Sequence, residues 1–322
     1  MEYRKLGKTN LDVSVIGFGA WAIGGDLWGH QDDEESIKAL RKSVELGCNF
    51  IDTAAVYGMG HSEEVVSRFL KETKSEIFIA TKVPPKNFRW PAKKGTPINE
   101  AFPKDWIISE TEKSLKRLKK EYVDLQQIHV WTEEWIDCDE WLSALVKLKE
   151  QGKIRFYGVS INAFDANSGV ELCKREVVDT IQVVYNIFEQ APEDNLFPEA
   201  IKHNIGIIAR VPLDESSLTG KLTKETKFDP DDFRSRYFKG ERLIETVERV
   251  ERVKQVAEKN KISLVELALR FSFSHPAVST SIPGIRNINQ AEMNISSGSK
   301  GKLTEEILCE LKKHRWDRDW RI

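Results

Sequence analysis

The chain has 322 residues, with 49 lysines and arginines against 51 aspartates and glutamates and a formal net charge of −2. This near-neutral balance gives no electrostatic reason to expect nucleic acid or an anionic membrane surface as a partner. The length allows one large core, so we expect residues 1–322 to form a single domain.

In chain order, the first pattern is an alternation of apolar and polar residues over positions 3–19, around Thr9-Asn10. It predicts a β-hairpin that runs into a first barrel strand near Val15–Gly19. Residues 32–47 then begin with acidic residues and end in Gly47, which is typical of a capped helix.

Short apolar runs alternate with helix-like segments along the rest of the chain, and together with the first strand they number eight. The runs span residues 48–52, 76–82, 122–129, 154–160, 178–185, 205–211 and 277–282. The clearest helical patterns span residues 61–72, 105–120, 139–152, 241–259 and 263–274. Because each run is typical of a buried parallel strand followed by a crossover helix, the order predicts an α/β fold. We expect a (β/α)8 TIM barrel whose N-terminal hairpin caps the barrel bottom.

Three segments interrupt this regular order. Residues 83–104 are proline-rich and too long for an ordinary strand-to-helix loop, and residues 212–240 are polar and punctuated by glycine. Residues 303–322 predict a surface helix whose aromatic end stays at the surface.

Cysteine usage and the start of the chain indicate the compartment. The four cysteines are widely spaced and form neither a disulfide framework nor a metal-ligand pattern: Cys48, Cys138, Cys173 and Cys309. The opening MEYRKLGKTN lacks the apolar core of a signal peptide, and no stretch approaches about 18 consecutive apolar residues. We expect a cytoplasmic protein with reduced thiols, no membrane span and no metal site.

Four polar residues lie at or just past the ends of successive apolar runs: Asp52, Tyr57, Lys82 and His129. In a closed parallel barrel the carboxyl ends of the strands open onto one face, so these side chains should meet there. An ammonium close to a phenol lowers its pKa by about one to three units, so Lys82 can make Tyr57 a better acid. Asp52 can keep Lys82 charged, and His129 can orient a carbonyl oxygen or share the proton.

Each of these residues alone has an ordinary structural explanation, such as a solvated lysine at a strand end or a tyrosine that packs in a turn. Their occurrence together at successive strand ends favours a proton-transfer site. The segments NFIDTAAVYG, IATK and QIH, which carry them, resemble in order and spacing the catalytic tetrad of the aldo-keto reductases. The resemblance extends from the opening hairpin to SIPGIRNINQ near the end of the chain.

This resemblance implies a (β/α)8 barrel that reduces aldehydes and ketones to alcohols with NADPH, or in some members NADH, and without a metal. By resemblance, Tyr57 is the general acid, Lys82 and Asp52 adjust its pKa, and His129 orients the carbonyl. The segment GFGAWAIGG at 17–25 is not GxGxxG and does not open directly into a helix, which argues against a Rossmann site.

In the reductases, the segment that corresponds to residues 17–25 passes beside the nicotinamide ribose. The resemblance therefore places Gly19, Ala20 and Trp21 at the cofactor together with Asp52, and Trp21 at the substrate pocket as well. Core packing at the barrel rim is the alternative for Trp21.

GVSIN at 158–162 is similar to the family's Gly-Val-Ser-Asn, whose serine and asparagine bind the nicotinamide carboxamide. Ser160 fits that pattern, whereas the intervening isoleucine shifts Asn162 by one position, so Asn162 is either a ligand or an ordinary turn asparagine. Gln182 matches a glutamine on the sixth strand that also bonds the carboxamide, with a structural role for a buried amide as the alternative.

Residues 209–221 match the end of the seventh strand and the loop that clasps the pyrophosphate. Arg210 stands where many relatives place an aromatic ring on the nicotinamide; a planar guanidinium can stack as well, or pair with an acid. The other expected clasp residues are Val211, Pro212, Leu213, Leu218, Gly220 and Lys221.

SIPGIRNINQAEMN at 281–294 runs from the last strand into a helix, whose N-terminus is a natural phosphate site. Arg286 can fork onto a ribose 2′-phosphate, and Gln290 and Asn294 follow on one helical face toward the adenine. Pro283 and Gly284 complete the expected contacts. Relatives often carry Lys in place of Gly284 and Arg in place of Gln290, so this chain places fewer cations near a 2′-phosphate. With Arg286 as the remaining cation, we expect NADPH as the favoured cofactor and NADH as the alternative.

The substrate is expected to be a small carbonyl compound that reaches Tyr57 and His129. Trp90 in the proline-rich loop and Trp131 just after His129 either wall a pocket for an apolar carbonyl or anchor that loop to the barrel. No pattern indicates a particular sugar, steroid or aldehyde. We expect a monomer, because no exposed apolar stripe indicates an interface.

Two other functions fit parts of these patterns. Proteins that resemble this family also serve as cofactor-sensing partners of membrane channels, with little or no turnover, although the complete tetrad favours an enzyme. A barrel hydrolase would need a second carboxylate at a strand end, and the candidates Asp124 and Asp179 fall early in their runs.

Overall fold

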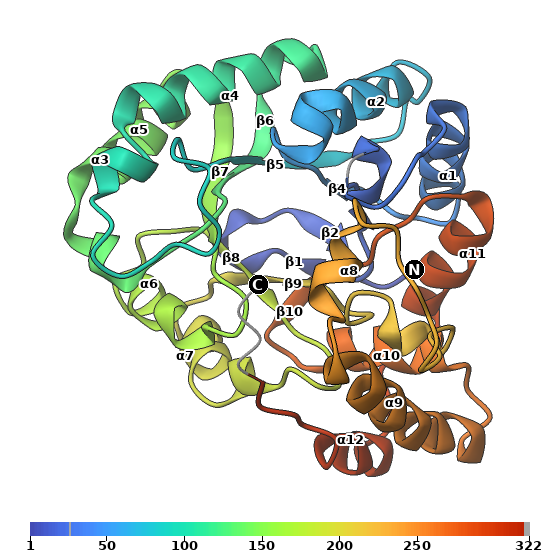
Figure 1. The fold of residues 1–322 in the computed structure, drawn as a ribbon. Helices are drawn as coiled ribbons and strands as arrows, with labels where there is room; N and C mark the ends of the chain where they lie inside the picture. The colour runs from blue at the N-terminus through green and yellow to red at the C-terminus, as the bar shows by residue number, and fades with distance from the viewer. Residues whose placement is uncertain (26, 319–322) are drawn as a thin grey trace.

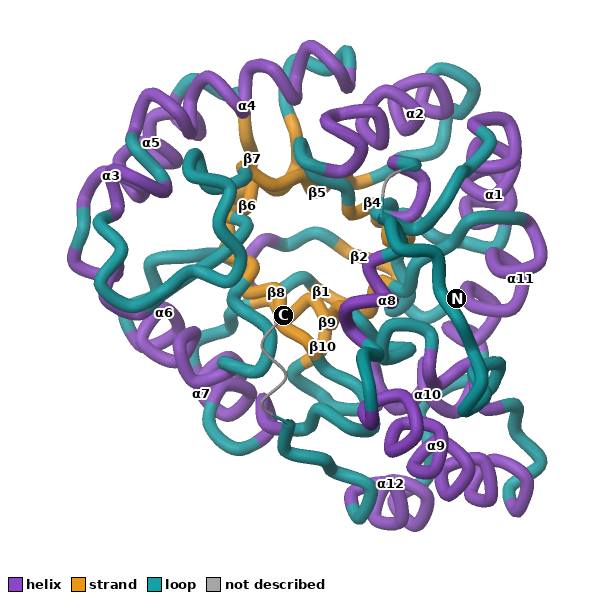
Figure 2. Tube along the Cα trace, viewed as in Figure 1, coloured by secondary structure: helices purple, strands orange, loops and turns teal. Residues whose placement is uncertain are grey.

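Eight parallel strands form one sheet in a computed structural model that describes residues 1–25 and 27–318. Each strand pairs with its neighbour in chain order, and the ring that they form is surrounded by helices (Figures 1 and 2). The strands are β3 (Phe18–Gly19), β4 (Phe50–Asp52), β5 (Phe78–Val83), β6 (Val123–Ile128), β7 (Ile154–Ser160), β8 (Thr180–Val184), β9 (Gly206–Arg210) and β10 (Val278–Ile282). The prediction of a (β/α)8 barrel is confirmed.

The first and last strands are joined by backbone bridges. Ile16 and Ser281 form one parallel bridge, and Gly19 and Gly284 form another. Gly19 fits here because an added Cβ would lie 2.8 Å from the carbonyl oxygens of Ile282 and Pro283. A side chain at this position would push the two edges apart, so the close approach of β3 to the β10 segment requires glycine.

The N-terminal hairpin covers the closed end of the barrel, as expected. It consists of β1 (Tyr3–Lys5) and β2 (Asp12–Ser14), which pair antiparallel, and Arg4 donates from Nη1 to the carbonyl of Val278 at 2.8 Å. Apolar side chains of the hairpin pack with side chains of the barrel strands in one buried cluster: Leu6, Leu11 and Val13 with Phe50, Phe78, Ala80, Leu125, Ile208 and Ile282.

Side-chain caps mark the start of four of the described α-helices: α1, α8, α10 and α11. Asp32 accepts a hydrogen bond from the Glu35 N–H at the start of α1, and Ser263 does the same for Glu266 at the start of α10. The helices are α1 (Asp33–Glu45), α2 (His61–Leu70), α3 (Ile98–Ala101), α4 (Lys104–Leu118), α5 (Asp139–Glu150), α6 (Val170–Lys174), α7 (Leu196–Lys202), α8 (Phe233–Tyr237), α9 (Glu241–Lys259), α10 (Leu264–Ser274), α11 (Ile288–Ser296) and α12 (Glu305–Lys312).

The three irregular segments hold short helices or pack back onto the barrel. The proline-rich segment contains α3, and the polar segment between β9 and α9 contains α8. The expectation for the aromatic end of the chain is wrong at Trp316, which is 8% exposed and lies against Phe188 at a ring distance of 5.9 Å. Trp320 lies outside the described residues.

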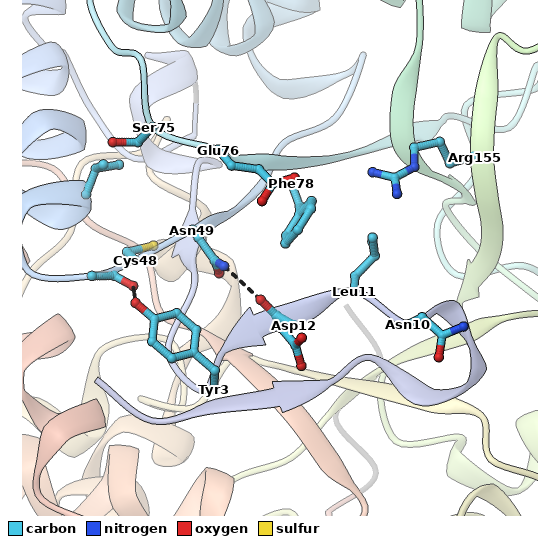
Figure 3. Close-up of a pocket in the computed structure, with 12 residues that line it drawn as sticks. Tyr3, Asn10, Leu11, Asp12, Cys48, Asn49, Ser75, Glu76, Phe78 and Arg155 are labelled. Atoms are coloured by element: carbon cyan, nitrogen blue, oxygen red, sulfur yellow. Dashed lines mark hydrogen bonds between the residues drawn. The ribbon is translucent and has the colours of Figure 1, made fainter.

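A hollow of about 550 Å³ opens at the closed end, between the hairpin and the strand starts (Figure 3). Two hydrogen bonds join residues that line it: Tyr3 Oη donates to Gly47 O at 2.9 Å, and Asn49 Nδ2 donates to Asp12 O at 2.8 Å. None of its lining residues belongs to the predicted tetrad. Among the described residues, no helix combines the length and apolar composition needed to cross a bilayer.

Candidate active site

Lys82 joins the predicted tetrad at the open end of the barrel. Its Nζ donates to Asp52 Oδ1 at 2.5 Å, to the carbonyl of Thr53 at 2.8 Å and to Tyr57 Oη at 3.1 Å. The strand register explains this arrangement, because Asp52 at the end of β4 pairs with Ala80 of β5. Residues two positions apart share a face of a strand, so Lys82 points to the same side as Ala80, one step nearer the open end.

The second oxygen of Asp52 is also held. Oδ2 accepts from Gln182 Nε2 at 2.8 Å and from Gln127 Nε2 at 3.2 Å. Gln182 thus lies beside the tetrad with its amide nitrogen bonded to a carboxylate, and its contact with a nicotinamide carboxamide stays a prediction. Gln127 was missed at the sequence level, although its position two residues before His129 indicates the same barrel face.

His129 lies beside Tyr57, with the two rings edge to face at 5.7 Å. Its backbone N–H donates to Val83 O at 3.1 Å, which places the residue at the mouth of the barrel. Its Nδ1 is buried and has no hydrogen-bond partner among the described residues. Burial, followed by the charges of Lys82 and Arg210, lowers the pKa of His129 well below 6.5, so the imidazole is neutral near pH 7.

The pKa of Tyr57 departs from the sequence expectation. Burial raises the pKa of the phenol above 10, and the opposing effect of Lys82 is smaller, so the expected net lowering is wrong for this structure. Lys82 itself is completely buried; burial lowers its pKa, but Asp52 and Tyr57 outweigh that effect and raise it above 10.5. At neutral pH the pair is therefore a protonated phenol beside a charged ammonium.

Gly19, Ala20 and Trp21 line the rim next to this group. Ala20 N–H donates to Asp52 O at 2.9 Å, and the Trp21 ring stacks on Tyr57 at 5.9 Å. Two aromatic neighbours of Trp21 were not anticipated. Trp28 and Phe233 each lie 5.4 Å from its ring, and Phe233 comes from α8 in the long polar segment. Trp28 lies only seven residues from Trp21, whereas Phe233 comes from a distant loop, so local patterns could not reveal its contact.

The two residues of GVSIN that are expected around a nicotinamide carboxamide differ in whether their side chains already have hydrogen-bond partners. Ser160 is buried at the end of β7, and its hydroxyl makes no hydrogen bond among the described residues. Asn162 instead pairs with the proline-rich segment: Nδ2 donates to Ala92 O and Oδ1 accepts from Ala92 N, each at 3.1 Å. Ser160 is thus open to a ligand, whereas Asn162 already has a partner.

Arg210 ends β9 and points its charge toward the tetrad. Nη2 donates to Ile161 O at 3.1 Å, while the buried Nε has no partner among the described residues. Burial lowers the pKa of Arg210, and the largest opposing effects come from Tyr57 and Glu215. An ion pair with an acid, one alternative considered from the sequence, is not formed with any described residue.

The segment after β9, residues 211–221, is called here the clasp loop. Four of its non-glycine residues have positive φ: Val211, Asp214, Glu215 and Ser216. The expected contact residues lie along it, with Pro212 and Leu218 buried, Val211 and Leu213 half-buried, and Gly220 and Lys221 exposed.

The segment after β10 is tied to the loop that follows β3. Arg286 donates from Nε to Gln31 Oε1 at 2.8 Å and from Nη2 to His30 O at 2.7 Å. Gln290 Oε1 accepts from the Arg286 N–H at 2.8 Å. Asn294 is 2% exposed, and its Nδ2 donates to Gly284 O at 3.4 Å, which ties α11 to the segment that follows β10. Gly284 is exposed, and Pro283 is buried beside Gly19.

The two tryptophans expected at the substrate pocket lie in different places. Trp90 is 40% exposed, and its ring meets His129 edge to face at 6.0 Å. Trp131 is fully buried and donates from Nε1 to Ser168 O at 3.0 Å, with Trp141 packed at 5.1 Å. Trp90 therefore borders the open site, whereas Trp131 packs among the helices.

Comparison with known proteins identifies relatives of this chain along nearly its whole length. A sequence model described as the Aldo/keto reductase family matches residues 15–315. The chain is 33% identical to the aldo-keto reductase YhdN of Bacillus subtilis over 91% of this chain and 87% of the relative. It is 30% identical to the aldo-keto reductase yakc of Schizosaccharomyces pombe, whose name includes NADP(+), over 96% and 90% of the two chains. The solved structure of the glycerol dehydrogenase AKR11B4 from Gluconobacter oxydans superposes with a TM-score of 0.80 at 32% identity, covering 97% of this chain and 94% of that one.

Proposed function

The chain belongs to the aldo/keto reductase family of NAD(P)H-dependent oxidoreductases that act on small carbonyl compounds, and from that premise we propose that it reduces aldehydes or ketones with Tyr57 as the general acid. The observation that supports this role is the position of Lys82 Nζ, which lies 2.5 Å from Asp52 and 3.1 Å from the Tyr57 hydroxyl. A proton donor, a cation that stabilises its conjugate base, and a carboxylate that holds the cation thus share one group.

Each residue has a defined part in this proposal. Tyr57 Oη holds the proton and donates it to the carbonyl oxygen as negative charge develops there. Before the reaction, the raised pKa of the buried phenol keeps Tyr57 protonated. After proton transfer, the charge of Lys82 stabilises the phenolate. His129, neutral near pH 7, orients the carbonyl oxygen by a hydrogen bond. A bound reduced nicotinamide would supply the hydride.

The described residues fit a nicotinamide cofactor along β7, β9 and β10. Among the described residues, the Ser160 hydroxyl makes no hydrogen bond and the buried Arg210 Nε has no partner, so both have hydrogen-bonding capacity left for a ligand. The clasp loop and the start of α11 would hold the phosphates, with Lys221 and Arg286 as the nearby cations. We propose NADPH over NADH, on the condition that Arg286 exchanges its bond to Gln31 for the 2′-phosphate.

The proposed substrate is an apolar or aromatic carbonyl. Trp21 and Trp90 border the tetrad, and Phe88, 50% exposed, lies 6.1 Å from Trp90. Such rings give an apolar ligand surface to bury without demanding a specific polar partner. We also propose that residues 1–322 act as one monomeric unit in the cytoplasm, in keeping with four cysteines that are all free.

The test is an assay of the purified protein with a panel of aliphatic and aromatic carbonyls, run with NADPH and with NADH and followed at the nicotinamide absorbance. We expect steady oxidation, faster with aromatic aldehydes. Tyr57→Phe should lower turnover by about 10²- to 10⁴-fold and leave the cofactor Kd almost unchanged. Cofactor binding without turnover on the whole panel would contradict the enzymatic proposal and favour a sensor.

A further inference from the structure

The C-terminal segment returns to the open end of the barrel. The backbone N–H of Trp316 donates at 2.9 Å to the carbonyl of Phe188, which lies in the loop after β8. Beyond it, Arg318 is buried and donates from Nη2 to Asp214 Oδ1 at 2.8 Å. The Arg318 guanidinium also lies over the rings of Trp316 and Phe164, at 4.8 and 5.4 Å. The chain end therefore brings a cation to the clasp loop.

Asp214 forms the corner of the clasp loop. Its N–H donates to Val211 O at 3.0 Å, and its Oδ2 accepts from Ser217 Oγ at 2.7 Å. Asp214, Glu215 and Ser216 have φ values of 45°, 50° and 79°. Side chains other than glycine adopt this region only when the surrounding structure holds them there, so the partners of Asp214 help to define the shape of the loop.

The charge of Asp214 conflicts with the proposed ligand of this loop. A pyrophosphate is anionic, and two like charges repel more strongly in a buried site than in water. Arg318 and Asp214 are both almost completely buried, with side-chain exposures of 0% and 1%, so solvent cannot screen the carboxylate. The guanidinium of Arg318 therefore neutralises the Asp214 carboxylate at the corner of the clasp loop.

We infer that Arg318 is a positioning residue for the dinucleotide: it fixes Asp214 at the corner of the clasp loop and neutralises it, so that the loop accepts a pyrophosphate. This inference rests on the proposed function, because it requires the cofactor to pass along the clasp loop. Arg318 acts through Asp214 and does not itself contact the reacting atoms.

The experiment measures the Kd of NADPH by fluorescence titration of the full-length protein. Arg318→Met should raise the Kd by about tenfold or more, because it leaves a buried carboxylate without its counter-ion beside the anion. Adding Asp214→Asn to that variant should bring the Kd back to within about threefold of wild type. Loss of tail docking alone would not be repaired by Asp214→Asn, so the double variant separates charge compensation from a purely structural role.

Arg315 provides a matched control in the same segment. It donates two hydrogen bonds of 2.7 Å to Asp194, away from the clasp loop. Arg315→Met should bind NADPH like the wild type. An equal weakening in Arg315→Met, or no recovery in the double variant, would overturn the inference.

Two outcomes separate this inference from the proposed function. If the wild type binds NADPH and Arg318→Met binds it with the same Kd, the inference is refuted and the proposed function stands. If the wild type does not bind NADPH, the proposed function is refuted. If Arg318→Met does not fold, the double variant Arg318→Met/Asp214→Asn decides, because it leaves no unpaired buried charge. It should bind NADPH within about threefold of the wild type, and weaker binding overturns the inference.

Discussion

The Lys82–Asp52 and Arg318–Asp214 pairs are both buried at the open end of the barrel, but different features of the chain position them. Lys82 and Asp52 stand on adjacent strands, and the register of β4 with β5 brings them together. Arg318 and Asp214 are 104 residues apart, one in the chain end and the other in a loop with three successive positive φ values. The first pair depends on a ladder of strands, and the second on contacts between loops.

This difference divides the site into two halves. Around β4 to β6, short bonds link Asp52, Lys82 and Tyr57 without any help from a ligand, so the proton-transfer group is preorganised. Around β7, β9 and β10, two polar side chains are bonded to segments distant in the sequence: Asn162 to Ala92, and Arg286 to Gln31. Binding of a 2′-phosphate by Arg286 requires exchange of its bond to Gln31, so mutations in this half should change affinity more than chemistry.

The largest expected effect is in the strand-built half. Lys82→Met leaves Asp52 buried with only the amide donors of Gln127 and Gln182. Breaking a buried ion pair in this way should lower the free energy of unfolding by about 3–5 kcal/mol. Turnover should fall by at least about 10²-fold, because the phenolate of Tyr57 loses its cation. Chemical denaturation and steady-state kinetics measure the two effects separately.

A double variant provides the control for Lys82→Met. Adding Asp52→Asn removes the unpaired charge, so most of the stability should return while the activity stays lost. A loss of less than about 1 kcal/mol in the single variant would mean that the pair is not the structural centre of this half.

The strand-built half was also the part that sequence patterns predicted well. Asp52, Lys82 and His129 end successive apolar runs, and a parallel barrel brings all such ends to one face, so spacing alone placed them together. The net pKa of Tyr57 was predicted in the wrong direction because burial, which a sequence does not quantify, outweighs the cation. Gln127 was missed although its alternation with His129 marks the same face.

The loop-built half could not be predicted to the same degree. The match of GVSIN to the family pattern suggested Asn162 as a ligand, but its bonds to Ala92 depend on the path of a segment 70 residues away. The burial of Trp316 and Arg318 depends likewise on contacts across the barrel, and nothing in the local pattern distinguishes this end from an exposed one. Long-range loop contacts carry no periodic signal.

The next largest effect concerns Arg286 in the loop-built half. If this side chain leaves Gln31 to bind a 2′-phosphate, Arg286→Ala should weaken NADPH by about 10- to 100-fold, the worth of charge-assisted hydrogen bonds, and NADH much less. Gln31→Ala frees Arg286 Nε and leaves only the bond from Nη2 to His30 O to be exchanged, so NADPH affinity should rise by a few-fold. Titration of both cofactors against both variants measures this. Equal losses for NADPH and NADH in Arg286→Ala would show that it only ties the loops.

A smaller effect is expected at Asn162. Asn162→Ala removes both bonds to Ala92, which loosens the segment that carries Trp90. The KM for aromatic carbonyls should rise by about three- to tenfold, in line with the loss of one or two hydrogen bonds, and the cofactor Kd should stay the same. The opposite split, a raised cofactor Kd with an unchanged KM, would assign Asn162 to the carboxamide as the family resemblance implies.

The smallest effect is a pH dependence of stability that arises near the chain end. Glu189 is 5% exposed in the loop after β8, and burial raises its pKa to about 7 from 4.5, against the opposing charge of Arg318. Between these values the folded protein keeps a proton that the unfolded chain has released, so the free energy of unfolding falls as pH rises from about 4.5 to about 7 and then levels off. Glu189→Gln removes this group, so the loss of Tm between pH 5.5 and pH 8 should shrink by about 1–3 °C in calorimetry. Part of the loss should persist, because burial also raises the pKa of Glu215 to about 7. A variant that loses as much Tm as the wild type would show that Glu189 is already ionised in the folded protein, with the charge of Arg318 outweighing burial.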